Sequence, residues 1–336
     1  MTKYLRIPKF LTIKVTLLAN EFIWKLYFKL NRRLETLREI KSHFINWPSV
    51  AYKRWTNQFP FSAVLRSNHE TILFKSIGEY FAFTLASNCA GRIRNAFFDD
   101  ADNALRFDYR DRHLRFAGVK SSESVFGNGD FSIFCDETYG DLDVQGKMVL
   151  DIGANIGDSA IYFALQGAVR VIALEPFPRI FSYLKQNIEA NGLSSTITPL
   201  NAGISCRDMA IKVSSESLTD TGSQLTLEDD PLKGGVSVLT YSLKTLSQSF
   251  GLKDAALKMD CEGCEYDAVL NSDTDTLRKF SQIYIEYHYG GKKLTSKLEE
   301  CGFQVVCSET TKFYNFGSTN KAVYLLGHLT ASRRVG

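Results

Sequence analysis

The sequence predicts an α/β protein built on an open, mainly parallel seven-strand sheet with a terminal antiparallel pair, preceded by a helical extension. Three observations support this fold class. Short apolar runs that suit buried strands alternate with helical segments from about residue 147 onward. The first of these runs leads into a Gly-rich turn and then a helix. The last two runs are separated by only a short loop, which favours antiparallel pairing.

Charge divides the 336-residue chain into two unequal parts. The first 58 residues carry twelve Lys and Arg against three acidic residues, although the net charge of the whole chain is only +3. A basic, aromatic-rich head on a mildly acidic body indicates two functional parts. We expect an N-terminal basic helical region over residues 1–100, a small β-hairpin lead-in over 101–146 and the main α/β domain over 147–330.

The basic head leaves two interpretations open for Phe10–Leu30. Trp24 and its aromatic neighbours could lie at a lipid boundary, which would give residues 1–58 a peripheral membrane contact. A helix packed on its own domain or on a partner subunit is favoured, because apolar positions run nearly all round the helix. Charged residues interrupt the stretch, so we expect no membrane span. No recognisable module indicates nucleic-acid binding, and the oligomeric state is left open.

Local patterns place the elements in order. The head is expected to be helical to about residue 60, and Glu70–Cys89 continues as helix. Alternating residues predict strands at Leu105–Tyr109 and His113–Phe116, and Phe131–Phe134 adds another. Later strands are expected at Val149–Ile152, Val169–Leu174, Ile197–Leu200, Ala210–Val213, Ala255–Met259, Gln282–Ile285, Phe303–Cys307 and Ala322–Leu326. Helices are expected at 157–166, Ile180–Asn191, Ser242–Phe250, just after Glu262 and at Leu294–Cys301, with a polar loop over Ser214–Gly235.

The Gly-rich turn after the first strand indicates a nucleoside site. The dinucleotide fingerprint needs glycines at 153, 155 and 158, and only the first is present, so a nicotinamide dehydrogenase is disfavoured. An acid, Glu175, ends the next strand, where a carboxylate can accept both ribose hydroxyls. A ligand with a ribose but no required diphosphate fits this pattern, and S-adenosylmethionine is such a ligand. The residues assigned to it are Asp151, Gly153, Asn155, Gly157, Glu175, Asn201 and Asp260.

Four segments in order resemble the FkbM family of methyltransferases. They are Val149–Ser159, Ala173–Pro176, Leu257–Glu265 and Ile283–His288. The resemblance covers roughly residues 135–327 and departs from the usual pattern at Cys261 and Cys264. It implies a class I methyltransferase (Rossmann-like) fold, S-adenosylmethionine as donor, and O-methylation, often of sugars or small metabolites.

Candidate catalytic residues lie after the fourth and fifth strands, where sites of α/β proteins open. They are Asp260, Glu262, Glu286 and His288. His288 is the natural base, because its ordinary pKa is near neutrality, and the alternative is a hydrogen-bonded structural histidine. Asp260 is expected to orient donor or acceptor. Glu262 and Glu286 are expected to contact the acceptor, and Glu137 and Tyr139 could form a lid.

Metal and thiol chemistry are not favoured. A divalent cation at these strand ends is an open alternative, but no sharp ligand pattern supports it. Zinc at Cys261 and Cys264 is disfavoured because no second Cys/His pair completes four ligands. The seven scattered cysteines predict reduced thiols in a cytoplasmic protein.

The sequence therefore predicts an S-adenosylmethionine-dependent methyltransferase, with O-methylation of a sugar or small-metabolite hydroxyl favoured. Two alternatives stay open: an N-methyltransferase of the same fold, and a non-catalytic S-adenosylmethionine-binding or scaffold protein. The expected partner is a small-molecule or glycan acceptor, whose identity is not readable from the residues.

Overall fold

The computed structural model describes residues 34, 36–89, 91–122, 125–126, 131, 133–213, 236–315 and 322–333. The N-terminal part contains α2 (Trp47–Trp55), β1 (Phe61–Val64), β2 (Thr71–Phe74), α3 (Ile77–Asn88), β3 (Ile93–Asp99), β4 (Ala104–Tyr109), β5 (Arg112–Ala117), β6 (Lys120–Ser122), β7 (Val125–Phe126) and α4 (Ile133–Asp136). Then follow β8 (Met148–Ile152), α5 (Asp158–Leu165), β9 (Arg170–Leu174), α6 (Pro178–Ala190), β10 (Ile197–Leu200), β11 (Ala202–Ile204), β12 (Met209–Val213), β13 (Val236–Tyr241) and α7 (Leu243–Ser249). The chain closes with β14 (Ala255–Met259), α8 (Cys264–Leu270), α9 (Thr274–Leu277), β15 (Phe280–Tyr287), α10 (Lys292–Glu300), β16 (Phe303–Cys307), β17 (Thr311–Asn315) and β18 (Ala322–Arg333).

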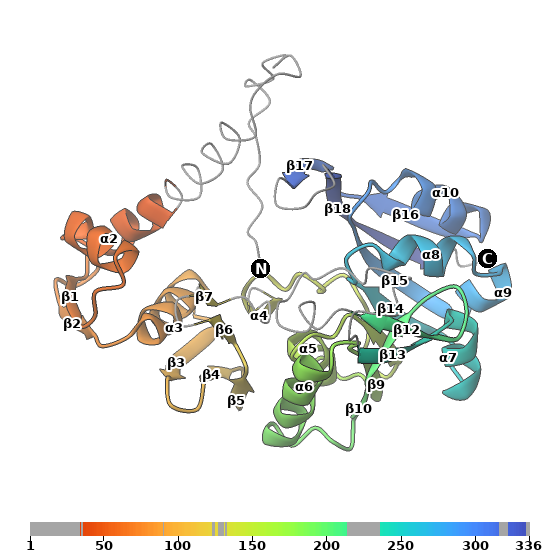
Figure 1. The fold of residues 1–336 in the computed structure, drawn as a ribbon, viewed down its shortest axis with the longest axis horizontal. Helices are drawn as coiled ribbons and strands as arrows, with labels where there is room; N and C mark the ends of the chain where they lie inside the picture. Colours follow the sequence, from red (N-terminus) through yellow and green to blue (C-terminus); the bar gives the residue numbers. More distant parts are fainter. Residues whose placement is uncertain are drawn as a thin grey trace, which may run out of the picture.

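A large sheet forms the C-terminal part of the molecule (Figure 1). Its main path runs in the order β10-β9-β8-β14-β15-β18-β16, and β17 pairs with β18 outside that path. The first five strands of this order are parallel, whereas β18 is antiparallel to both β15 and β16. The predicted seven-strand sheet with its terminal antiparallel pair is thus confirmed. Strand order reverses between β8 and β14, which is where open α/β sheets bind ligands.

Helices cover both faces of this sheet because its strands are apolar on both sides. One face packs on α5 and α6 through strand residues that include Val149, Val171, Ala173, Ala256 and Tyr284. The alternate residues pack on α7, α8 and α10, among them Leu150, Ile152, Leu257, Ile283 and Ile285. Burial on both faces explains why these strands read as continuous apolar runs in the sequence.

The first hundred residues contain more strand than the sequence indicated. β1 pairs with β2, and β3 joins β4 and β5 in a three-stranded sheet that crosses the expected boundary at residue 100. The prediction of a helix over Glu70–Cys89 is wrong at β2. The helix α3 begins only after Ser76, because the side chain of Ser76 caps it by accepting a hydrogen bond from the N–H of Glu79. The predicted β4–β5 hairpin is confirmed.

The strand expected at Phe131–Phe134 is also wrong. Residues Ile133–Asp136 form the short helix α4. Phe131 and Phe134 are both buried against the aromatic rings of the β4–β5 hairpin. A short apolar run suits either a strand or a helix, and tertiary packing decides between them.

The second half of the basic head folds onto its own chain. Ile40, Phe44 and Val50 are fully buried in a cluster with aromatic residues of β1, β2 and α3. The two interpretations of Phe10–Leu30 fall outside the described residues, as does the expected loop over Ser214–Gly235. Within the described ranges, no helix has the length and hydropathy that a membrane crossing requires.

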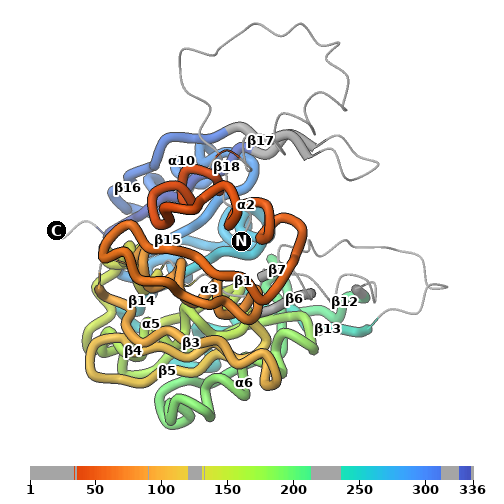
Figure 2. Tube along the Cα trace, turned by 90° about the vertical axis from the view of Figure 1, so that its left-hand side faces the viewer, coloured from red at the N-terminus to blue at the C-terminus, as the bar shows by residue number. Residues whose placement is uncertain are grey.

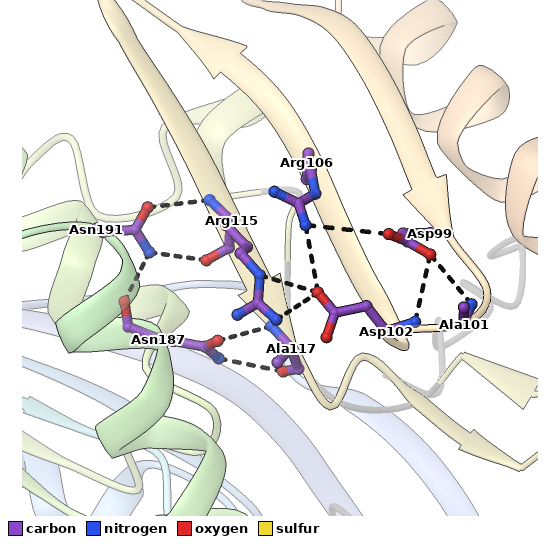
Figure 3. A network of polar contacts seen from close by, with 8 residues as sticks. All are labelled: Asp99, Ala101, Asp102, Arg106, Arg115, Ala117, Asn187 and Asn191. Carbon is purple, nitrogen blue, oxygen red and sulfur yellow. Dashed lines mark hydrogen bonds and ion pairs between the residues drawn. The ribbon is translucent and has the colours of Figure 1, made fainter.

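Asn187 of α6 and Asn191, the residue that caps the end of this helix, join the N-terminal sheet to α6 (Figure 3). Asn187 accepts from the N–H of Ala117 and donates to its carbonyl at 2.6 and 3.2 Å. Asn191 makes the same pair of bonds with Arg115, at 3.0 and 2.7 Å. These amides satisfy the free backbone groups of β5 as a neighbouring strand would. Asn187 also donates to the carbonyl of Ile156 at 2.8 Å, so one buried side chain joins β5, α6 and the turn after β8.

The cysteines differ from the expectation of reduced thiols. Cys89 is joined to Cys135, and Cys261 to Cys264, by disulfides. The first bridge connects the end of α3 to α4, elements that the sequence alone could not bring together. The second encloses Glu262 and Gly263, just before α8. Cys206, Cys301 and Cys307 are free.

Candidate functional site

The turn after β8 has the backbone shape that a close ligand approach requires. Gly153 and Gly157 adopt φ of +76° and +96°, and Asn155 adopts +50°. A Cβ atom on Gly153 would lie 1.8 Å from the carbonyl oxygen of Asp260, so this position also needs glycine for the contact between β8 and β14. Gly157 precedes α5, whose first N–H groups have no acceptor within the helix.

Glu175 at the end of β9 holds this turn in place. One carboxylate oxygen accepts from the N–H of Asn155 and the other from the N–H of Phe177, both at 3.0 Å. Burial raises the pKa of Glu175 to about 7, against the lowering effect of these two N–H groups. Asn155 Oδ1 is buried beside it and has no hydrogen-bond partner among the described residues. The turn therefore offers two acceptor groups to a ligand.

Asn201 has a structural role that the sequence did not show. Its side-chain amide donates to the carbonyls of Glu175 and Pro176 at 2.9 and 3.1 Å. These bonds fix the loop after β9 from the end of β10. The residue lies at the expected edge of the sheet, but its amide hydrogens are already used, so an adenine contact would involve its oxygen.

Asp151, which the sequence assigned to the ligand, is buried and is bound by neighbouring residues. Its side chain is 0% exposed, accepts from Ser159 Oγ at 2.7 Å, and forms an ion pair with Lys258 Nζ at 3.2 Å. Lys258 also donates to the carbonyl of Gly153 at 2.9 Å. Burial disfavours its ammonium, but Asp151 and the other nearby carboxylates outweigh this and raise the pKa of Lys258. Sequence reasoning missed Lys258, although a lysine inside the apolar strand β14 is itself a signal.

A cluster of carboxylates surrounds His288 at the ends of β14 and β15. His288 is 1% exposed, with Nδ1 3.1 Å from Glu265 Oε1 and Nε2 3.3 Å from Glu262 Oε2. Asp260 Oδ1 lies 4.0 Å from the same Nε2. Burial alone would lower the pKa of His288, but the hydrogen bond and charge of Glu265, with Glu262 and Asp260, raise it to about 9. In these surroundings the imidazole is protonated at neutral pH, which is not the state of a free base.

Two further groups belong to this cluster. The charge of Asp260 raises the pKa of Glu286 to about 8, and burial adds to the shift. Burial also raises the pKa of Glu262. The four predicted residues Asp260, Glu262, Glu286 and His288 are therefore brought together. Glu265 was missed because its place on α8 gives no pattern of its own.

Of the two residues suggested as a lid, only one lies near the cluster. Tyr139 is buried, and its ring packs edge-on against that of Tyr284 on β15, with centroids 4.9 Å apart. Burial and the charge of Asp260 raise its pKa. Glu137 pairs instead with Arg92 on the surface, at 3.7 Å.

The turn from Gly153 to Gly157, called the donor turn below, is adjacent to the carboxylate cluster. Gly153 contacts the backbone of Asp260, and Lys258 joins both strands. The turn after β8 and the titratable carboxylates thus meet at the reversal of strand order, which is where open α/β sheets of the class I methyltransferase kind bind ligands.

Comparison with known proteins points to one methyltransferase family within this fold class. Residues 151–305 match the model of the methyltransferase FkbM domain. Residues 151–305, a little less than half of the chain, are therefore similar to an FkbM methyltransferase domain, in line with the motifs, and S-adenosylmethionine is the methyl donor that this similarity implies.

More distant likenesses are weaker. An uncharacterized protein, 158B, of Sulfolobus islandicus rod-shaped virus 1 is 26% identical over 150 residues, which span 45% of this chain and 66% of that relative. M. jannaschii TYW2, solved with AdoMet, is 14% identical over 71% of this chain and 90% of its own, with a TM-score of 0.37. A SAM-dependent O-methyltransferase of Thermotoga maritima is 14% identical over 60% and 64%, with a TM-score of 0.33. These scores are too low to support the fold, which rests on the strand order.

Proposed function

We propose that this protein transfers the methyl group of S-adenosylmethionine to a hydroxyl of a sugar or small metabolite. The observation that carries the proposal is the cluster of Asp260, Glu262, Glu286 and His288 beside the donor turn. A hydroxyl is a poor nucleophile until it loses its proton, so a group of carboxylates at the acceptor position suits oxygen chemistry.

The residues divide the work of donor binding. Glu175 and Asn155 would accept hydrogen bonds from the ribose, and the turn from Gly153 to Gly157 gives the backbone room to approach it. The donor supplies a methyl group on a positively charged sulfur. The excess of carboxylates favours a cation at that position, and Lys258 is already neutralised by Asp151.

Methyl transfer then needs alignment and a place for one proton. The acceptor oxygen forms a bond to the methyl carbon while the carbon–sulfur bond breaks with its electron pair going to sulfur. A carboxylate of the cluster takes the hydroxyl proton. His288, held between Glu265 and Glu262, positions these carboxylates, which replaces the role of free base expected from the sequence.

Two other functions use the same fold. An N-methyltransferase would need a pocket for an amine, and the carboxylates would also suit that group. A binding or scaffold protein would keep the donor pocket without turnover. We also propose two partners. A glycan or small-molecule acceptor is proposed from the family resemblance, and a peripheral membrane contact through residues 1–58 is proposed from the basic head.

Donor analogue binding and turnover separate these functions. The protein is incubated with isotopically methyl-labelled S-adenosylmethionine and panels of hydroxylated and amine acceptors, and products are analysed by mass spectrometry. We expect label on oxygen, lost in Asp260→Asn, while S-adenosylhomocysteine still binds. Label on nitrogen would replace the proposal by its first alternative. Donor binding with no turnover on any acceptor in the panel, including sugars and glycans, would count against an enzyme.

A further inference from the structure

Three possible metal ligands converge at the carboxyl ends of β14 and β15. Asp260, Glu286 and His288 each offer one donor atom, and these atoms lie within 4.8 Å of one another. His288 Nε2 is 4.0 Å from Asp260 Oδ1. An ion with bonds of about 2.0–2.2 Å holds its donors at most about 4.4 Å apart, so small rotations of the carboxylates are enough to close the set.

The buried ring nitrogen of His288 is an independent indication. The residue is 1% exposed, and Nε2 makes no hydrogen bond within the part of the chain that the structure describes. It faces Asp260 and lies 3.3 Å from Glu262 Oε2 without the geometry of a hydrogen bond. Buried polar atoms without a hydrogen bond are rare in folded proteins, and a cation would satisfy this one.

The other ring nitrogen is held as metal-binding histidines usually are. His288 Nδ1 lies 3.1 Å from Glu265 Oε1, and Glu265 is fully buried. The same Glu265 oxygen accepts from the N–H of Cys261 at 3.2 Å, which fixes the carboxylate. Histidine ligands commonly donate their second N–H to a carboxylate, which sets the tautomer and aims the first nitrogen at the ion.

We propose that Asp260, Glu286 and His288 bind a divalent cation, with Glu265 as the positioning residue for the imidazole. Two carboxylate oxygens and one imidazole nitrogen suit Mn²⁺ and related first-row ions. The cation replaces the proton on Nε2 and offsets the charge of the surrounding carboxylates. The cation would bind the acceptor oxygen and ease the loss of the acceptor's proton. This role rests on the proposed function, whereas the binding of the ion does not.

Binding of Mn²⁺ to the full chain, without donor or acceptor, tests this site. Affinity is measured by titration of the free-ion electron paramagnetic resonance signal, and ligand identity by electron spin-echo modulation from imidazole nitrogen. Asp260→Asn, a substitution at a half-buried residue, is compared with His288→Asn and Glu265→Gln. His113→Asn, an exposed histidine on β5, is the matched control. Circular dichroism checks the fold of each variant.

We expect a Kd below about 1 mM, nitrogen modulation in wild type, and loss of that modulation in His288→Asn. Asp260→Asn and Glu265→Gln should each weaken binding by about tenfold or more, and His113→Asn should change nothing. Absence of Mn²⁺ binding, or binding without nitrogen modulation, would overturn the site. Titration of the same samples with S-adenosylhomocysteine distinguishes failure of the metal site from failure of the proposed function. Donor binding without metal leaves the proposed function standing, and metal without donor leaves the site standing.

Discussion

At the scale of single residues, Glu175 connects the backbone of the turn with the ligand. Its carboxylate accepts two backbone N–H groups and still has lone pairs for a ribose. Burial holds its pKa at about 7, far above that of an ordinary glutamate. The ionised form, which accepts hydrogen bonds best, is therefore only partly populated at neutral pH.

This shift predicts how donor affinity depends on pH. If the ligand favours the ionised carboxylate, then the affinity for S-adenosylhomocysteine should rise by about tenfold between pH 6 and pH 8, as the free protein passes through the pKa of Glu175. Glu175→Gln cannot ionise, so its affinity should be lower and almost flat over that range. Calorimetric titration at several pH values measures both. An equal slope in wild type and variant would assign the pH dependence to another group.

Gly153 makes a second residue-scale prediction. Gly153→Ala places a Cβ against the carbonyl of Asp260, at a backbone angle that disfavours side chains. We expect a loss of about 2 kcal/mol or more in the free energy of unfolding, measured by urea denaturation. Gly192→Ala is the control, because it shares a positive φ but meets no atom within 4 Å. Equal losses of unfolding free energy in the two variants would show that the contact with Asp260 adds nothing to the cost of the new side chain.

At the scale of elements, the pair Asp151 and Lys258 joins β8 to β14 inside the core. Lys258→Met leaves Asp151 buried without its cation, which typically costs about 3–5 kcal/mol. In Lys258→Met with Asp151→Asn no unpaired charge remains, so part of the loss should be recovered. Urea denaturation of the wild type, the two single variants and the double variant checks this. A double variant as unstable as the sum of both single variants would contradict the coupling.

Sequence patterns predicted the large sheet well because each of its strands is a continuous apolar run. They failed where tertiary packing decided between two local structures, at β2 and at Phe131–Phe134, and at both disulfides. At the site, they placed Asp260, Glu262, Glu286 and His288 on one edge because parallel strands end together. They could not show that Glu265 faces His288 or that Asn201 donates to the backbone, since these contacts depend on side-chain direction.

At the scale of the whole molecule, hydrogen bonds link the N-terminal sheet to the donor turn. The strand β5 of this sheet lies against α6 (Figure 1, Figure 2). Asn187 links Ala117 of β5 to the carbonyl of Ile156 in the donor turn. The N-terminal part therefore supports the turn after β8 in addition to any role it has toward the acceptor.

This link predicts an effect on ligand binding from outside the pocket. Asn187→Ala leaves buried backbone groups of Ala117 and Ile156 without partners, which should cost about 1–3 kcal/mol of stability and also weaken S-adenosylhomocysteine binding. Asn191→Ala breaks the bonds to Arg115 and one to the carbonyl of Asn187 but none to the turn after β8, so it should leave that affinity unchanged. Thermal unfolding and calorimetry measure the two effects. Unchanged affinity in Asn187→Ala would separate the N-terminal sheet from the donor site.

The most direct test of the central claim is calorimetric titration of the full chain with S-adenosylhomocysteine, with NADH as control. We predict binding of the first ligand only, weakened by about 1–3 kcal/mol in Glu175→Ala, as expected for loss of a charged hydrogen bond. Binding of NADH, or of neither ligand, would contradict the account, because the turn after β8 would then hold another nucleotide or none.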